Sequence, residues 1–338
     1  MSLLHLPTEL ILSLMKFLEA ERDVNSLAQT NQLLYKILNP HLYRLNARDF
    51  KSSALLWAAR HGKIATARKS IQAGANLMAE DSPRRTVSRR GEYRGTALSR
   101  AAEYGHGAVV EMLLETGQID VESKDSCGYT PFAHAANAGH EAVVNLLLET
   151  RKIDIESRDS YDCTPLMHAA GGGHKAIVKL LLESGQVDIE SRDNFESTPL
   201  MHAAGGGHEA VVKLLLDSGG VNLEAKDEQG YTPFFHAAGG GNESVVKLFL
   251  DTGQVDVDAS SYYGFTPLSE AAWNGHEGIV KLLLETGKVD VNKTNLSGTA
   301  LSLAAESGHE SIVKLILETG QVDVHEHGNS FPNNTFTS

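Results

Sequence analysis

Apolar and polar positions repeat along most of the chain with a period of 34 residues. In each period Thr-Pro-Leu, a pair of alanines, Gly-His and a Val-Lys-Leu-Leu-Leu run follow in the same order. Threonine is a favoured N-cap and proline suits the first helical position, so each Thr-Pro predicts the start of a short helix that ends at the glycine nine residues later. The threonines are Thr96, Thr130, Thr164, Thr198, Thr232 and Thr266, with Thr299 following after 33 residues.

A second helix is predicted in every period, from the histidine after that glycine through the leucines. It ends at a glycine such as Gly185, which suits the position just after a helix. The remaining dozen residues are β-branched and acidic with polar tips, and they predict an extended, hairpin-like connection. Neither helix can bury its apolar side alone, so the pattern predicts an all-α solenoid in which stacked neighbours share a continuous core.

A 34-residue period also fits a tetratricopeptide array, but the residues decide otherwise. Thr-Pro-Leu, Ala-Ala, Gly-His and Val-Val-Lys-Leu-Leu-Leu closely resemble the ankyrin repeat, lengthened here by one residue in the Gly-Gln-Val-Asp connection. The resemblance covers residues 53–327. The units at Thr96 and Thr299 have alanine in place of proline, and Ser53 to Asn76 is a degenerate first unit, so we count eight repeats.

The first fifty residues have a different pattern. Leu-Pro-Thr-Glu-Leu-Ile opens a predicted amphipathic helix, and leucine-rich sequence continues to Leu42-Tyr43. This segment resembles an F-box, although the tryptophan often found near the end of that domain is absent. The resemblance implies docking of an Skp-type adaptor of a cullin ubiquitin ligase, and the alternative is a helical cap over the first repeat. The matching positions are Leu6, Pro7, Leu10, Ile11, Leu14 and Leu18.

Charge divides the chain into the same regions. Residues 1–50 are neutral, residues 51–100 carry +8 and residues 101–338 carry −21, which gives −13 overall. We therefore expect an F-box-like domain at 1–50, a first repeat with a basic insertion at 51–94, seven repeats at 95–328 and a disordered tail at 329–338. The insertion is a solvated loop, a docking arm for an acidic partner or a nuclear-import patch. Its arginines are Arg84, Arg85, Arg89, Arg90 and Arg94.

The composition also limits the partners. A net charge of −13 disfavours general binding to nucleic acid or to an anionic membrane, because both require a positive surface. No apolar run reaches the roughly 18 residues that a membrane helix needs. Two cysteines are too few for a disulfide framework, which predicts a reduced cytosolic or nuclear protein. We expect the chain to be monomeric apart from its partners.

Histidines and aromatic residues at repeated positions are the candidate contacts for a protein partner. The histidines that follow the turn glycine are structural by the ankyrin resemblance, and those four residues after the threonine are predicted to line the concave groove, either as plain contact or packing residues or as a pH-responsive set. The groove histidines are His134, His168, His202 and His236. The aromatic candidates are Phe235 and Trp273 on the groove side and Tyr129, Tyr161, Phe195, Tyr231, Tyr262, Tyr263 and Phe265 at the tips. The alternative for the tip residues is packing on the next connection.

No enzymatic chemistry is predicted. Equivalent histidines on neighbouring repeats are about 8–10 Å apart, too far to share a zinc ion, so we expect no metal, cofactor or catalytic residue. Triple glycines such as Gly171–Gly173 lack the Gly-Lys-Ser/Thr of a phosphate loop. They either let a partner's backbone approach or reflect recent duplication.

These observations predict an adaptor. By resemblance the chain is the substrate-recognition subunit of an SCF-type ubiquitin ligase, a combination of domains common in filamentous fungi. The head would hold the adaptor and the ankyrin groove the target. The alternative is an ankyrin scaffold or transcription co-regulator, with the first fifty residues serving only as a cap.

Overall fold

The computed structural model describes residues 39–40, 42–44, 46–47, 52–81 and 94–323. Packing divides the chain into two compact parts. We call residues 1–169 with 184–187 the N-terminal block, and residues 170–183 with 188–338 the C-terminal block. The predicted F-box-like positions, Arg84 to Arg90 of the basic insertion and the predicted tail at 329–338 lie outside the described residues.

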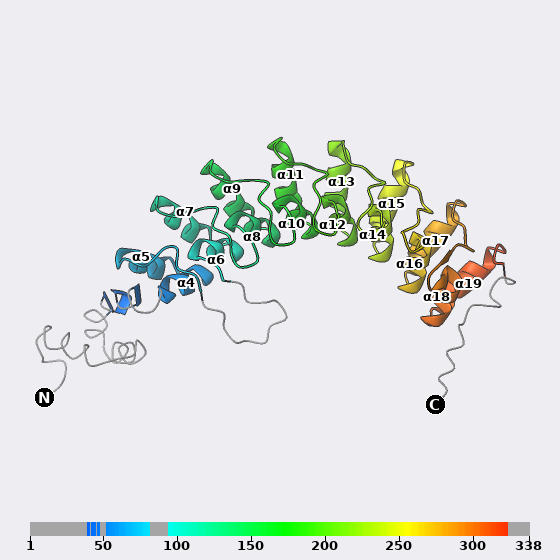
Figure 1. Ribbon diagram of the computed structural model, residues 1–338, viewed down its shortest axis with the longest axis horizontal. Helices are drawn as coiled ribbons and strands as arrows, with labels where there is room; N and C mark the ends of the chain where they lie inside the picture. The colour runs from blue at the N-terminus through cyan, green and yellow to red at the C-terminus, as the bar shows by residue number, and fades with distance from the viewer. Residues whose placement is uncertain (1–38, 41, 45, 48–51, 82–93, 324–338) are drawn as a thin grey trace, which may run out of the picture. The chain divides into compact units, whose positions relative to one another are not determined.

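Short helices follow one another in pairs through both blocks (Figure 1). We call the first helix of each repeat the inner helix and the second the outer helix. In the N-terminal block the pairs are α4 (Ser53–Arg60) with α5 (Ile64–Gln72), α6 (Ala97–Glu103) with α7 (Gly107–Glu115), and α8 (Pro131–Ala138) with α9 (Glu141–Glu149). The boundary between the blocks falls in the next repeat, which holds α10 (Pro165–Gly171) and α11 (Lys175–Glu183).

The C-terminal block continues the same order and adds the one strand pair of the described residues. Its pairs are α12 (Pro199–Gly205) with α13 (Glu209–Ser218), α14 (Pro233–Gly239) with α15 (Glu243–Thr252), α16 (Pro267–Trp273) with α17 (Glu277–Glu285), and α18 (Ala300–Glu306) with α19 (Glu310–Glu318). Strands β1 (Thr294–Asn295) and β2 (Gly298–Thr299) pair antiparallel just before α18. The described residues hold no helix with the length and apolar character needed to cross a bilayer.

The inner helices begin as the sequence predicts. The Thr130 hydroxyl accepts a hydrogen bond from the backbone N–H of Ala133 at 3.1 Å, and Pro131 occupies the first turn of α8. The helix ends at Gly139, whose φ of 78° lies in the left-handed region that favours glycine. Threonine caps of the same kind start α6, α12, α14, α16 and α18. Capping of these inner helices therefore comes from their own sequence.

The core of each block is a strip between neighbouring repeats. Ala135 and Ala136 of α8 are fully buried, and Val143, Val144 and Leu147 of α9 are buried with them. Inner helices pack on inner helices, as α6 does on α8 and α14 on α16, while outer helices such as α13 and α15 pack on each other. The predicted helical solenoid is confirmed within each block, because the apolar faces of successive repeats there pack on one another.

Histidines in the turns between the inner and outer helices hydrogen-bond to the preceding repeat. In the N-terminal block His140 donates from Nε2 to the carbonyl oxygen of Glu103 at 3.0 Å. In the C-terminal block His208 donates to the carbonyl oxygen of Gly171 at 2.8 Å. His106, His276 and His309 make equivalent bonds to the preceding repeat. The structural role predicted for this set is confirmed at these five positions.

The connections differ from the predicted hairpins. We call the turn that precedes each inner helix, such as residues 193–197, a tip. At most described tips one aspartate carboxylate accepts two backbone N–H groups of the turn, so the turn is closed without a strand ladder. Among the described tips, only the one at 294–299 pairs as strands, with Thr294 opposite Thr299.

Candidate functional site

An aspartate and a histidine form a pair at four successive tips. In the tip at 193–197, Asp193 Oδ1 accepts the N–H groups of Phe195 and Ser197, both at 2.9 Å. The other carboxylate oxygen accepts a hydrogen bond from Nε2 of His202, on the following inner helix, at 2.8 Å. The four pairs are Asp125–His134, Asp159–His168, Asp193–His202 and Asp227–His236. Each pair fastens a tip to the helix that follows it.

The carboxylates of three of these pairs, Asp159, Asp193 and Asp227, are held ionised. Burial alone would raise the pKa of Asp159, but hydrogen bonds from His168 and from the backbone N–H groups of Tyr161 and Cys163 outweigh it, and the pKa is lowered. The pKa values of Asp193 and Asp227 are lowered by the same balance. Hydrogen bonds to the charged form favour ionisation, so the tips depend on these charges.

The histidines of the pairs are therefore attached to the tips and do not stand free in a groove. His134 is 4% exposed, which fits the packing alternative predicted for it and leaves no surface for partner contact. His168 is also mostly covered, and His202 and His236 are about one-third exposed. A role in partner contact stays a prediction for the last two. The signal that identifies the pairs is an aspartate nine residues before each of these histidines.

Two of the predicted aromatic contacts are packing residues. Tyr129 lies between the rings of His134 and His168, with centroid distances of 4.9 and 4.7 Å. Burial and the nearby Asp159 carboxylate raise the pKa of Tyr129, so its hydroxyl keeps its proton. Phe235 is 5% exposed and stacks on Tyr231 at 4.1 Å, so its predicted place on the open groove is wrong.

Other aromatic residues are exposed at the tips. Tyr161 in the N-terminal block and Phe195 and Tyr263 in the C-terminal block each expose about half of their surface. Trp273 is exposed at the end of α16 and stacks against Phe265. The residue that sequence reasoning missed is Leu296, which is 79% exposed between β1 and β2. Its place in the tip register, beside two tyrosines of the preceding repeat, was the available signal.

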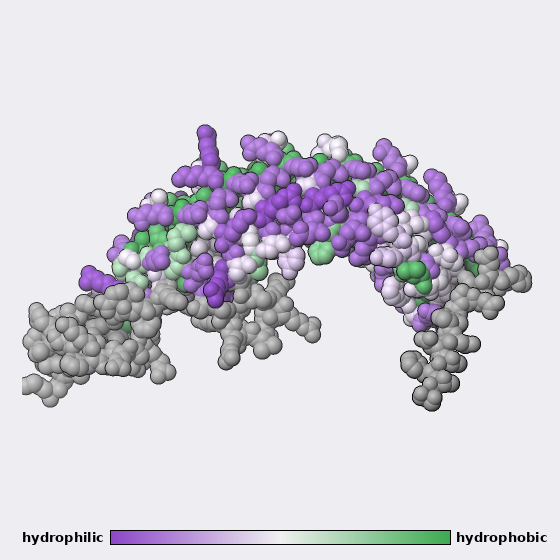
Figure 2. Space-filling view, viewed as in Figure 1, coloured by the Kyte–Doolittle hydropathy of each residue, from purple (hydrophilic) through white to green (hydrophobic). Residues whose placement is uncertain are grey.

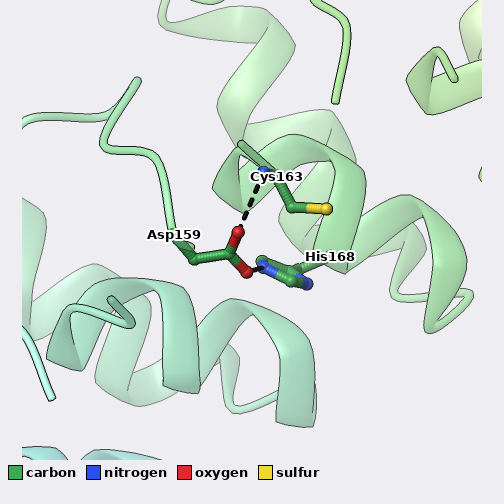
Figure 3. Close-up of side chains that lie close together, drawn as sticks. All are labelled: Asp159, Cys163 and His168. Atoms are coloured by element: carbon green, nitrogen blue, oxygen red, sulfur yellow. Dashed lines mark hydrogen bonds and ion pairs between the residues drawn. The ribbon is translucent and has the colours of Figure 1, made fainter. Parts of the chain in front are cut away.

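One tip brings a cysteine beside its aspartate and histidine (Figure 3). One ligand atom from each of Asp159, Cys163 and His168 lies within 4.8 Å of the other two, and this residue set suits zinc. Asp159, however, already bonds the Cys163 N–H at 3.0 Å and the His168 ring at 2.9 Å. The same bonds recur at tips without a cysteine, so hydrogen bonding alone accounts for the arrangement. The expectation of no metal centre stays a prediction.

Family comparison agrees with the fold. The model for ankyrin repeats (3 copies) matches residues 55–159, 98–193, 153–227, 186–261 and 219–295, and the model for a single ankyrin repeat matches residues 298–329. The chain belongs to the ankyrin-repeat family. Proteins of this family are typically non-enzymatic interaction modules, and the repeats imply a protein–protein interaction role. A comparison with curated proteins gave no match.

The resemblance of residues 1–50 to an F-box is supported by the sequence alone. No F-box model matched the chain, and residues Leu6 to Leu18 lie outside the described residues. The adaptor, the cullin and the fungal type of architecture inferred from that resemblance are therefore carried forward only as a proposal.

Proposed function

We propose that this chain is a non-enzymatic adaptor that recruits a target protein to an SCF-type ubiquitin ligase. In this proposal the ankyrin repeats hold the target, and the first fifty residues hold an Skp-type adaptor and, through it, the cullin. The proposed location is the cytosol, the nucleus or both.

The observation that carries the target-binding half is the exposure of large apolar side chains on fastened tips. Phe195 and Tyr263 project from turns whose backbone is already hydrogen-bonded within the tip. Binding of a partner to such side chains costs little conformational entropy in the turn, because the turn is ordered before binding. Exposed aromatic residues on an ordered frame are the kind of residue that becomes a hot spot in protein interfaces.

The adaptor-binding half is supported by the Leu-Pro-Thr-Glu-Leu-Ile sequence at residues 6–11. The test is a pull-down of a purified Skp-type adaptor by the full-length chain. We expect stable binding that is abolished by Pro7→Ala combined with Leu10→Ala. Trp57→Ala is the matched control, because Trp57 is an exposed apolar residue of the first repeat and its loss leaves the motif intact.

The pull-down separates the two functions considered. Failure of the wild-type chain to bind the adaptor would overturn the ligase proposal and favour an ankyrin scaffold or transcription co-regulator. Equal binding by the wild type and the double variant would show that the motif is not the binding element.

A further inference from the structure

The tips of the C-terminal block are joined into a continuous line by backbone hydrogen bonds. The N–H of Glu228 donates to the carbonyl oxygen of Phe195 at 2.9 Å, and the N–H of Tyr262 donates to that of Gln229 at 3.0 Å. The N–H of Leu296 then donates to the carbonyl oxygen of Tyr263 at 3.3 Å. Residues far apart in the sequence are therefore neighbours along one edge of this block.

Large apolar side chains are exposed along that edge. We call the four residues Phe195, Tyr262, Tyr263 and Leu296 the tip row. Phe195 and Tyr263 are each 51% exposed, Tyr262 is 68% exposed and Leu296 is 79% exposed. Most of the described surface in Figure 2 is hydrophilic, and hydrophobic areas lie over several helices, with a small one near α16 and α18. An exposed row of this kind, rimmed by polar groups, is typical of an interaction site.

Neighbouring residues hold Tyr262 in place. A Cβ atom at Gly230 would lie 2.8 Å from the Tyr262 backbone nitrogen and 3.0 Å from its ring, so the close approach requires glycine. On the same ring, the Lys226 ammonium lies 5.9 Å from the centroid. The Tyr262 ring is therefore already in contact with one cation, and cations bind favourably to tyrosine faces.

The row lies in acidic surroundings. The four tip segments 188–197, 222–231, 256–265 and 290–298 contain ten acidic and three basic residues, a net charge of −7. The three basic side chains, Arg192, Lys226 and Lys293, are engaged. Each donates to a backbone carbonyl of an adjacent tip, at 2.8, 3.1 and 2.7 Å respectively. Arg192 also pairs with Glu196, and Lys293 with Asp258, but the acidic residues remain in excess. A ligand that meets this edge therefore meets apolar side chains and a net negative charge together.

We propose that the tip row binds a segment of a partner protein in which arginine or lysine residues are interspersed with large apolar residues. Apolar side chains of the segment cover Leu296 and the tyrosine rings, while its cations meet exposed carboxylates of the tip segments, such as Glu196 and Glu228, and the faces of Tyr262 and Tyr263. Opposite charge gives the specificity, and the buried aromatic surface gives the affinity. This inference rests on the proposed function, because it names the class of target that the repeats hold.

The test is selection of peptides from a random twelve-residue phage library on the full-length chain. We expect the selected peptides to be enriched in arginine or lysine and in large apolar residues. Their affinity, measured by fluorescence polarisation of the synthetic peptides, should fall about tenfold or more in the Tyr262→Ser/Tyr263→Ser double variant and in Leu296→Ser. It should also fall as salt is raised, because exposed charges are screened.

Two matched controls locate the effect. Tyr161→Ser removes an equally exposed tip aromatic from the N-terminal block, and Leu317→Ser removes an exposed leucine from the outer helix α19. Both should leave peptide affinity within twofold of the wild type. Thermal unfolding of every variant shows whether it is folded, and the variants affect only exposed side chains.

Selected peptides that are acidic or uncharged, or that bind the tip-row variants as well as the wild type, would overturn the proposal. So would a selection that yields no binder. These outcomes leave the adaptor proposal standing if the Skp-type adaptor still binds the chain. If the adaptor does not bind but peptides of the expected kind are selected, the adaptor proposal fails and the tip-row proposal stands.

Discussion

Removal of a tip aspartate tests whether the Asp–His pairs hold the tips. We consider Asp193→Ala, because Asp193 is buried and lies beside Phe195 of the tip row. The change removes the acceptor for three hydrogen bonds, from the N–H groups of Phe195 and Ser197 and from His202, all between 2.8 and 2.9 Å. A hydrogen bond to a charged group contributes about 1.5–3 kcal/mol to stability. Water that reaches the opened turn bonds the freed N–H groups and recovers part of this loss. We expect a loss of about 3 kcal/mol.

The assay is urea unfolding of the full-length chain, with hydrogen exchange of the backbone amides as a local readout. Asp193→Asn keeps one oxygen for the two N–H groups and should lose about 1 kcal/mol. Glu196→Ala is the control on the same tip. Its ion pair with Arg192 is exposed at 3.4 Å, so we expect a change below about 0.5 kcal/mol.

Exchange of the Phe195 and Ser197 amides should accelerate at least tenfold in Asp193→Ala and stay unchanged in Glu196→Ala. The reasoning is refuted if both alanine variants unfold at the same urea concentration, or if the two amides exchange as slowly as in the wild type. Either result would show that the backbone closes the tip without the carboxylate.

Three further predictions follow from the same contacts. Gly171→Ala should raise the free energy of unfolding by up to about 1 kcal/mol, because its Cβ meets only an ordinary contact with His202 at 3.6 Å; unchanged peptide affinity would refute a role for this glycine in partner approach. Gly173→Ala should instead destabilise, as measured by urea unfolding, because φ is +73° and the new Cβ would lie 2.5 Å from the His208 ring. Acidification should lower the melting temperature, because the pKa values of three tip aspartates are lowered in the folded chain. The stability that these carboxylates contribute is present above their unfolded pKa of about 3.9 and is lost as pH falls through their folded pKa. Replacing those aspartates by asparagine should flatten that dependence between pH 5 and pH 2.5, in melts followed by circular dichroism, and an unchanged pH profile would contradict the assignment.

The sequence was sufficient for the repeat frame. Thr130 and Pro131 predict where α8 begins, and the paired alanines predict its buried face, because capping and close packing depend on neighbours within one repeat. The tips were less predictable. The acidic connection was interpreted as a hairpin, whereas a carboxylate such as Asp193 satisfies the turn by itself.

The candidate site shows the same limit. Helical spacing placed His134 and Phe235 on a groove, but spacing gives only the direction of a side chain. Asp125 from the preceding tip and the ring of Tyr231 cover these two residues, and both contacts arise only after the tip folds back on its helix. Leu296 was missed because its neighbour Tyr263 comes from another repeat.

Native mass spectrometry of the full-length chain, mixed with a purified Skp-type adaptor and a peptide selected on the tip row, tests the central claim most directly. The account predicts one complex that contains one copy of each, because the adaptor and the target are proposed to occupy separate parts of the chain. Tyr262→Ser/Tyr263→Ser should lose only the peptide, and Pro7→Ala/Leu10→Ala only the adaptor. Complexes with either ligand but never with both, or loss of both ligands in one folded variant, would contradict the claim that the chain links a target to a ligase.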